Sequence, residues 1–196
     1  MDYDYERLKL KELIIRNALS YSKKPITLSN GQKSHHYYDI KKVVLEPLGA
    51  KLISQLMLEE VKKFGKVKSV GGLEVGAIPV ATAISLWSHE TGDNISVFYV
   101  RKKPKEHGLK LRVEGNSKEP IVIVDDVVTK GASVLEAIDA LVAEGKQMLG
   151  VVSIIDRGAG ETTLKENGIK FSSLFKDKDF ARAIKKKKKE ELKIKS

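Results

Sequence analysis

The sequence contains no cysteine and no apolar run long enough to cross a membrane. Without cysteine the chain can form no disulfide, supply no thiolate nucleophile and bind no zinc through sulfur. The N-terminal stretch from Met1 to Glu6 is acidic, so we expect neither a secretory signal nor a transmembrane helix. The cytoplasm is therefore the expected location.

The composition is that of an ordinary globular domain. A chain of 196 residues, with 41% hydrophobic and 32% charged residues, suits one domain with a full hydrophobic core. Its net charge of +10 favours polyanionic partners, namely nucleic acid, an anionic membrane or phosphorylated metabolites. The positions of the charges have to decide among these three.

The first third of the chain predicts a small unit of helices and a hairpin. Residues 6–20 have the apolar spacing of an amphipathic helix. Extended segments at 25–28 and 36–40 flank the stretch 29–32, whose Asn-Gly pair favours a hairpin turn. A further helix is expected from Pro47 to Phe64, because proline is favourable in a first helical turn.

The rest of the chain alternates between apolar strands and helices. Strands that are apolar throughout and alternate with helices indicate a parallel sheet covered on both faces, which is an α/β fold. A basic loop, residues 101–119, interrupts this alternation, and the last residues, 181–196, carry the run from Lys185 to Lys189 and are expected to form a frayed basic helix or tail. The expected strands are 67–70, 95–100, 121–124 and 149–155, and the expected helices are 78–89 and 133–143.

The segment 121–133, Ile-Val-Ile-Val-Asp-Asp-Val-Val-Thr-Lys-Gly-Ala-Ser, combines sugar and phosphate chemistry. A buried strand is expected to end in Asp125 and Asp126, and a short loop then leads into a helix. Ligands of open α/β sheets bind at the carboxyl ends of strands, and the amide groups at the start of the helix bind anions. Gly131 permits close approach of a phosphate, while the carboxylates can accept hydrogen bonds from ribose hydroxyls or hold Mg²⁺ through water.

This thirteen-residue pattern resembles the signature with which type I phosphoribosyltransferases bind 5-phosphoribosyl 1-diphosphate (PRPP). The alternative is that Asp125 and Asp126 are only a solvated strand end and Ser133 only the N-cap of the following helix, and the complete pattern favours the signature. The resemblance implies a type I phosphoribosyltransferase fold, a parallel sheet flanked by helices with a small N-terminal hood at about 20–45. It also implies that Asp125 and Asp126 hold the ribose hydroxyls. The 5-phosphate would lie on Thr129, Lys130, Gly131, Ala132 and Ser133.

The basic loop resembles the mobile loop of orotate phosphoribosyltransferases, Arg-Lys-x-x-Lys-x-His-Gly. Arg101, Lys102, Lys105 and His107 match its cations and donors. Cations that close over a departing pyrophosphate would stabilise the charge that develops there. A solvated loop or a nucleic-acid patch is the alternative interpretation of these residues.

Two further segments match the part of that family which binds the pyrimidine. The hood sequence 26–39 resembles the family's hood, and Tyr37 and Tyr38 match the aromatic pair that lines the base. Ser29 stands where bacterial members often carry lysine, so Lys33 is a candidate replacement. Arg157, at the end of the strand 149–155, matches the arginine that meets the orotate carboxylate, for which a guanidinium is suited.

Two other features of the sequence are less informative. The glycine-rich turn 71–79 resembles the family's pyrophosphate loop, although no lysine stands near Gly76 as in some members. His35 and His36 are neighbours on an expected strand and should face opposite ways, which argues against a metal site.

The resemblance therefore implies an orotate phosphoribosyltransferase that converts orotate and PRPP to orotidine 5-monophosphate and pyrophosphate, with Mg²⁺, in UMP biosynthesis. The implied catalytic residues are Lys102, Lys105, His107 and Asp126, with orotate bound by Tyr37, Tyr38, Thr129 and Arg157. One domain, residues 1–180, would form a homodimer with shared active sites, followed by the tail 181–196.

Two alternatives remain. A purine phosphoribosyltransferase would need neither Arg157 nor the basic loop. A PRPP-sensing transcription regulator is favoured by the charge, but the residues before the hood are too few for a helix-turn-helix unit. Lysines without base-reading side chains give at most salt-sensitive binding, so no specific nucleic acid and no membrane are expected as partners.

Overall fold

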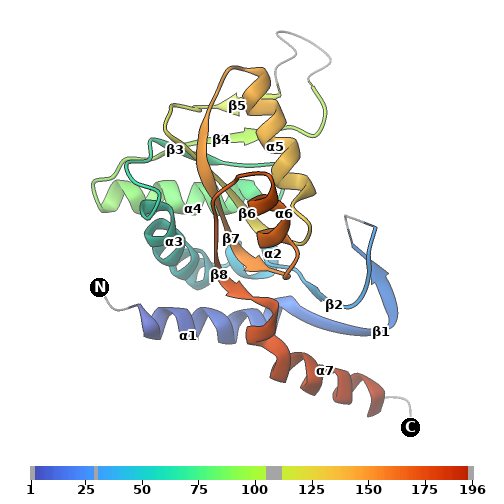
Figure 1. Cartoon of the computed structure of the whole chain (residues 1–196). Coiled ribbons are helices and arrows are strands. Elements are labelled where there is room, and N and C mark those ends of the chain that lie inside the picture. The colour runs from blue at the N-terminus through green and yellow to red at the C-terminus, as the bar shows by residue number, and fades with distance from the viewer. Residues whose placement is uncertain (1–2, 29–30, 105–111, 194–196) are drawn as a thin grey trace.

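The structure is a computed structural model that describes residues 3–28, 31–104 and 112–193 (Figure 1). The predicted site residues Lys105 and His107, and Ser29 in the hood, lie outside the described residues.

A six-stranded sheet forms the centre of the molecule (Figure 1). Its strand order is β5-β4-β3-β6-β7-β8, and the pairs are parallel except for the antiparallel pair β4 and β5. The prediction of a mostly parallel α/β sheet is therefore confirmed. The strands are β3 (Ser69–Gly71), β4 (Ser96–Val100), β5 (Val113–Gly115), β6 (Ile121–Val128), β7 (Met148–Asp156) and β8 (Phe171–Lys176).

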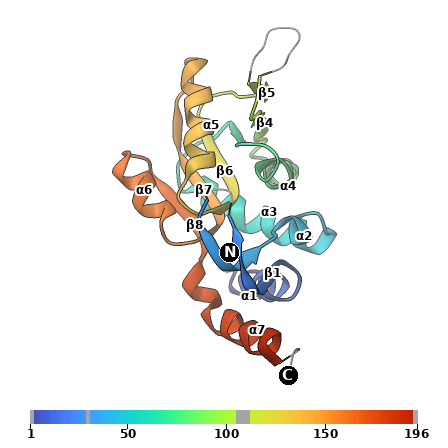
Figure 2. The same cartoon turned by 90° about the vertical axis from the view of Figure 1, so that its right-hand side faces the viewer.

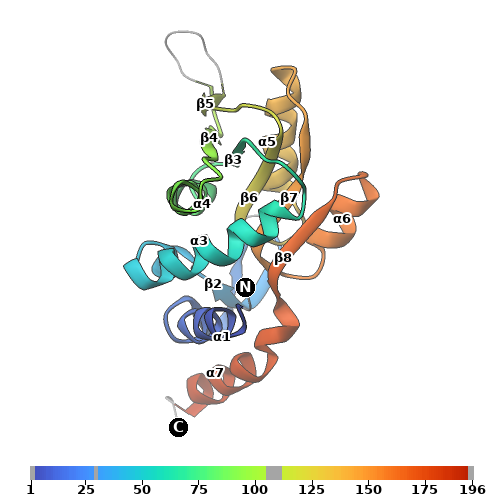
Figure 3. The same cartoon turned by 90° about the vertical axis from the view of Figure 1, so that its left-hand side faces the viewer.

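Helices cover both faces of the sheet. The side chains of β6 alternate, so that Val122 and Val124 pack with α3 and α4, whereas Ile121 and Ile123 pack with α5 and α6. Figures 2 and 3 show α4 and α5 on opposite sides of the sheet. Within the described residues, no helix has both the length and the apolar character needed to span a bilayer. The helices that cover the two faces of the sheet are α3 (Pro47–Lys62), α4 (Ala77–Glu90), α5 (Ala132–Ala143) and α6 (Gly160–Glu166).

The N-terminal hood contains the predicted hairpin. Strands β1 (Leu19–Thr27) and β2 (Lys33–Tyr38) are antiparallel, and α2 (Lys41–Val44) follows them. The predicted helix over 6–20 is wrong at its end: α1 (Asp4–Leu13) passes into the π-helical turn η1 (Ile14–Ala18), after which the strand begins. Leu19 is buried and pairs with Tyr38, so strand pairing outweighs the helical spacing of the apolar residues there.

Two predicted boundaries within the sheet are also corrected. Strand β6 does not end at the acidic pair, because Asp125 pairs with Ser153, and Val127 and Val128 continue the ladder with β7. The basic loop is not wholly an insertion between core strands, because its residues 113–115 form the edge strand β5. In both places the partner strand, which is remote in sequence, extends the sheet.

Of the two forms expected for the C-terminal segment, a frayed helix or a tail, the structure shows a helix, and its start is packed. A 3₁₀ turn, η2 (Asp177–Phe180), leads into α7 (Ala181–Lys193), which contacts β1 (Figure 1). Phe180 is fully buried, and Ala183 and Ile184 pack against the core. The first turn of α7 is thus part of the packed structure, while the lysines that follow are mostly exposed.

Candidate active site

The residues of the PRPP-like signature surround a cavity of about 450 Å³ at the carboxyl ends of the central strands. This is where an open α/β sheet binds its ligands. Lys102 and Tyr37 also reach this cavity from other parts of the chain. Of the predicted site residues, the cavity is lined by Tyr37, Lys102, Asp125, Asp126, Thr129, Lys130, Gly131, Ala132 and Ser133.

Asp125 and Asp126 form the floor of this cavity. Asp125 is only 6% exposed; its Oδ1 accepts the N–H of Asp126 at 2.9 Å and its Oδ2 accepts the Ser133 hydroxyl at 2.8 Å. Burial, and then the charge of Asp126, raise the pKa of Asp125, and burial raises the pKa of Asp126. Two carboxyl groups held this close to each other out of water favour ligands that bring hydroxyl donors or a cation.

The turn before α5 is shaped for an anion. Gly131 precedes the helix with φ +82°, a left-handed conformation that glycine adopts without strain, and its carbonyl accepts the Leu135 N–H at 2.8 Å. The amide groups that begin α5 line the cavity, where the helix dipole favours negative charge. The Ser133 hydroxyl does not cap the helix, because it donates to Asp125.

The glycine-rich turn 71–76 closes the cavity on the opposite side. A Cβ on Gly72 would lie 2.3 Å from the carbonyl oxygen of Val124, and one on Gly76 would lie 2.7 Å from Asp126 Oδ1. Gly72 is therefore required for close packing against the backbone of β6, whereas a side chain at position 76 would have to displace the Asp126 carboxylate. Glu74 accepts the backbone N–H of Lys102 at 2.9 Å, which ties this turn to the start of the basic loop.

The cations of the cavity come partly from unexpected positions. Lys102 lines the cavity, whereas Arg101 lies 3.9 Å from Glu114 and is not among the lining residues. Lys41, which sequence reasoning missed, lines the cavity and lies 3.1 Å from Asp39. Partial burial lowers the pKa of Lys41, but Asp39, Tyr37 and Asp126 outweigh this effect and raise it. Lys41 is thus a protonated cation of the hood that faces the acidic pair, whereas Lys33 is exposed.

A second cavity of about 390 Å³ adjoins the first beneath the hood. The two cavities share Tyr37, Asp126, Val127 and Thr129, so these residues form a common wall. The other residues that line the second cavity are Ile26, Thr27, Leu28, Tyr38 and Arg157.

The two tyrosines of the hood have different environments. Tyr37 is 38% exposed and lines both cavities. Tyr38 is 2% exposed, packs edge-on against Phe180, and donates its hydroxyl proton to Asp177 Oδ1 at 2.9 Å. Tyr38 therefore combines hairpin packing with a place in the wall of the second cavity.

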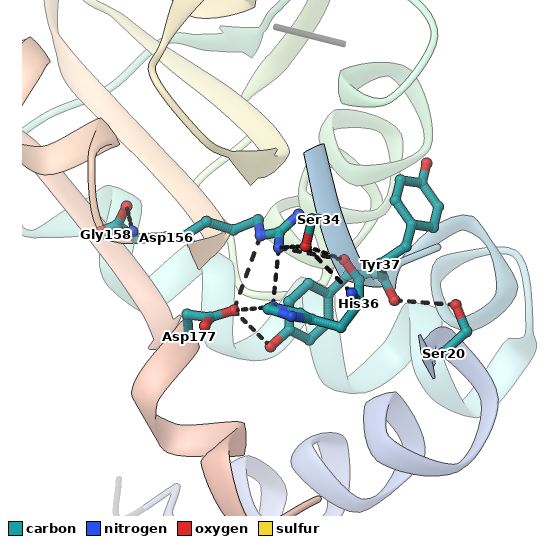
Figure 4. A network of polar contacts seen from close by, with 9 residues as sticks. Ser20, Ser34, His36, Tyr37, Asp156, Gly158 and Asp177 are labelled. Carbon is teal, nitrogen blue, oxygen red and sulfur yellow. Dashed lines mark hydrogen bonds and ion pairs between the residues drawn. The ribbon is translucent and has the colours of Figure 1, made fainter. Parts of the chain in front are cut away.

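Arg157 lies at the end of β7, where its side chain is 8% exposed. Its Nη2 donates to Ser34 Oγ at 2.9 Å and to the carbonyl oxygen of His36 at 3.3 Å, and its guanidinium lies 5.6 Å from the centre of the Tyr38 ring. Figure 4 shows Ser34, His36 and Asp177 converging on this point from the hood and the C-terminal segment.

Asp177 was not predicted, although a signal for it existed. It directly follows β8, the neighbour of β7, and the carboxyl ends of parallel strands meet at one edge of a sheet. His36 lies 2.9 Å from Asp177 Oδ1, whereas His35 contacts the carbonyl oxygen of Ser22 and stacks on Tyr21. The described part of the chain holds no cluster of three or more potential protein ligands for a metal.

A mostly parallel sheet with an acidic pair, a glycine-containing turn before a helix and a hood over its carboxyl edge is the arrangement of a type I phosphoribosyltransferase. No family model matches the chain. An orotate phosphoribosyltransferase of Rhodopseudomonas palustris is 41% identical over 174 residues, which are 85% of this chain and 92% of the relative. That of Aquifex aeolicus is 39% identical over 175 residues, 87% of this chain and 95% of the relative.

Solved structures agree with these relatives. The crystal structure of Mycobacterium tuberculosis orotate phosphoribosyltransferase with Fe(III) dicitrate has a TM-score of 0.75 and 32% identity, covering 89% of this chain and 98% of that one. An adenine phosphoribosyltransferase of Leishmania tarentolae, at 19% identity and a TM-score of 0.61, shares the fold, covering 89% of this chain and 90% of its own. The chain belongs to the orotate phosphoribosyltransferase family. It is a pentosyltransferase of pyrimidine biosynthesis.

Proposed function

We propose that the two adjoining cavities bind the two substrates of this reaction side by side. PRPP occupies the larger cavity and orotate the smaller one, so that the anomeric carbon lies beside their common wall. The observation that carries this assignment is the shared wall of Tyr37, Asp126, Val127 and Thr129. The tuberculosis enzyme has also been crystallised with PRPP, at 30% identity to this chain and a TM-score of 0.71.

The larger cavity has separate places for the parts of PRPP. Asp125 and Asp126 accept hydrogen bonds from the ribose hydroxyls, and the turn from Thr129 to Ser133 holds the 5-phosphate. The diphosphate then lies toward the turn 71–76 and Lys102. Lys102 and the predicted loop residues Arg101, Lys105 and His107 stabilise the charge of the departing pyrophosphate.

The smaller cavity selects the acidic pyrimidine. Tyr37 lies against the flat ring, with Tyr38 in the wall behind it, and Arg157 binds the carboxylate through its guanidinium. The ring nitrogen N1 of orotate attacks the anomeric carbon as the bond to pyrophosphate breaks. Since the transition state has oxocarbenium character, catalysis consists mainly of positioning and electrostatic stabilisation.

The donor chemistry of the larger cavity fits Mg²⁺. Asp126, Asp125 and Glu74 offer carboxylate oxygens there, and Mg²⁺ typically binds one or two carboxylates together with substrate phosphates and water. When it is bound with PRPP, Mg²⁺ neutralises charge on the diphosphate. We infer that the metal enters with the substrate instead of residing in a cage of protein ligands.

We further propose a homodimer in which the part of the basic loop beyond Lys102 serves the neighbouring site, while Lys102 stays at the site of its own chain. An apolar groove of about 400 Å³ between α3 and α4 supports an interface, because exposed apolar patches mark sites of association. Its rim includes the exposed Leu86, and Leu48 is exposed nearby on α3. The cytoplasmic location, and the absence of specific nucleic acid or membrane partners, stay predictions.

A spectroscopic assay of orotate consumption tests the assignment. With PRPP and Mg²⁺, the protein should consume orotate, whereas uracil and adenine should give no product. Because Arg157 is the cation in the smaller cavity, discrimination against uracil should depend on it. Turnover of adenine or uracil in preference to orotate would overturn the assignment of the smaller cavity.

Mixing two defective proteins tests the shared site. Lys105→Ala removes a loop cation and Asp126→Ala a carboxylate of the core site. If loops act across a two-fold interface, each heterodimer has one intact site, and random assortment restores about a quarter of wild-type activity. Subunit exchange is verified by native mass spectrometry. No recovery after proven exchange contradicts the shared site and leaves the enzymatic function standing.

A further inference from the structure

One oxygen atom, Asp177 Oδ1, brings together side chains from three distant parts of the chain (Figure 4). Tyr38 donates its hydroxyl proton to it at 2.9 Å, His36 Nε2 lies 2.9 Å away and Arg157 Nε lies 3.9 Å away. Asp177 is thus an anion behind the orotate cavity.

His36 Nε2 has two neighbours that make opposite demands on it. Arg157 Nη2 and Asp177 Oδ1 each lie 2.9 Å from this nitrogen. A guanidinium can only donate and a carboxylate can only accept, so a lone pair on Nε2 satisfies Arg157 and a proton on Nε2 satisfies Asp177. Within any single protonation state, one of the two contacts is therefore unsatisfied.

The hydrogen bonds of Arg157 indicate which protonation state His36 has when no substrate is bound. Within the described residues, the hydrogen bonds of its guanidinium all use Nη2, with Ser34 Oγ, His36 Nε2 and the His36 carbonyl oxygen as acceptors. A carboxylate that binds the guanidinium through both of its terminal nitrogens competes for Nη2. When Nη2 turns to such a ligand, His36 Nε2 loses its donor and becomes free to carry a proton toward Asp177.

The charges around His36 also favour a proton on its Nε2 once a substrate carboxylate is bound. Arg157 at the end of β7 and Asp177 in η2 have opposite charges, and Asp179 in η2 adds a second carboxylate whose Oδ2 accepts the Lys176 N–H at 2.7 Å. On the strand of His36 itself, burial and then Asp177 raise the pKa of Tyr38, so its hydroxyl remains a donor. A substrate carboxylate adds negative charge to this half-buried group, and an imidazolium compensates it.

We propose that His36 and Asp177 are positioning residues for Arg157, and that His36 takes up a proton from solvent when the substrate carboxylate binds. The inference rests on the proposed contact between Arg157 and orotate. In the empty site the neutral imidazole carries its proton on Nδ1 and accepts from Arg157 at Nε2. In the occupied site it keeps the Nδ1 proton and gains a second proton from solvent on Nε2, which it donates to Asp177. Binding of an acidic pyrimidine is thereby coupled to one proton, whereas a pyrimidine without a carboxylate leaves His36 unchanged.

The test compares His36→Asn with His35→Asn, a matched control whose imidazole faces Ser22 and Tyr21 instead. The KM for orotate is measured at saturating PRPP from about pH 5.5 to about pH 8.5, the range in which imidazole groups ordinarily titrate. For wild type and His35→Asn, this KM should rise about tenfold with pH. For His36→Asn it should be independent of pH and remain near the high-pH value of wild type.

The other titrating groups are controlled by the same comparison. Titration of Asp125 and Asp126 affects all three proteins alike, and the KM for PRPP should not distinguish them. Asp177→Asn, which keeps an acceptor for Tyr38 but removes the charge, should also keep the KM for orotate near the high-pH value. An unchanged pH dependence in His36→Asn, or equal effects on the KM for both substrates, would overturn the proposal.

Nuclear magnetic resonance of the wild-type protein gives a test that needs no His36 variant. The imidazole nitrogen signals of His36, assigned by elimination with variants of the other histidines, should change from neutral to doubly protonated when orotidine 5-monophosphate binds. The same state with and without this ligand refutes the coupling. If Arg157→Ala fails to raise the KM for orotate selectively, the proposed contact itself is wrong; a selective rise with a pH-dependent His36→Asn refutes only the inference.

Discussion

Replacing Asp125 by asparagine should stabilise the protein at alkaline pH while it removes activity. The Asp125 side chain is buried, and burial followed by the charge of Asp126 raises its pKa. Asparagine has the same shape, and its amide oxygen can accept the Asp126 N–H while its NH₂ group donates to Ser133 Oγ. The variant thus keeps the packing and removes a buried charge.

The size of the effect follows from the direction of the pKa shift. An unfolded aspartate titrates near pH 4, whereas the folded group keeps its proton to higher pH. The contribution of protonated Asp125 to the free energy of unfolding is fully present below about pH 4 and is lost as the pH rises through the folded pKa. Each pKa unit by which burial and the charge of Asp126 raise the Asp125 carboxyl costs about 1.4 kcal/mol of stability at alkaline pH. In a domain of this size, each kcal/mol is worth about 2–4 °C in Tm.

Thermal unfolding followed by circular dichroism at about pH 4.5 and about pH 8.5 measures this difference. Asp125→Asn should exceed wild type in Tm at the higher pH and match it closely at the lower one. Asp139→Asn, an exposed carboxylate on α5, should follow wild type at both. Turnover of Asp125→Asn should fall by about 10²-fold or more. An equal Tm difference at both pH values, or a lower Tm at alkaline pH, would refute the electrostatic argument.

Three further predictions concern the loop, the orotate pocket and the C-terminal helix. Lys105→Ala should lower kcat about 10²–10³-fold with little change in substrate binding, and unchanged turnover would remove Lys105 from the mechanism. Arg157→Ala loses a charge-assisted contact of about 2 kcal/mol, so steady-state kinetics should show the KM for orotate rising about 30-fold and that for PRPP much less. Equal effects on both would make Arg157 structural. Removal of residues 185–196 should leave activity largely intact. Ile184→Asp, within the packed first turn of α7, should instead lower the Tm. A collapse of activity on truncation would mean that the lysine-rich part covers the site.

Much of the fold could be predicted because its signals are local. The apolar run 121–124 and the periodic helices 47–64 and 133–143 agree with β6, α3 and α5 to within a few residues, apart from the extension of β6. The failures lie where a distant segment decides. Leu19 leaves its helix to pair with Tyr38, and β6 runs past Asp126 because β7 offers it a partner.

The residues of the candidate site also fall into two groups, those recognisable from the local sequence and those that only the fold brings together. Asp125, Asp126 and the turn 129–133 are adjacent in sequence, so their chemistry is recognisable from the order of the residues alone. Lys41 has no such pattern; it reaches the cavity of the acidic pair because α2, which begins at Lys41, packs against α3 and α4. Asp177 lies 141 residues from His36 in the chain and 2.9 Å from it in the fold.

The sequence by itself therefore determined the family, the alternation of strands and helices, and the segment predicted to bind phosphate and ribose, because each depends on contiguous residues. Only the tertiary structure decided that Tyr38 is a core residue, that Arg101 faces Glu114, and that Arg157, His36 and Asp177 share one network. The physical reason is that a hydrogen bond depends on distance and direction in space. The packing of the hood on the carboxyl edge of the sheet sets both, and no local spacing encodes them.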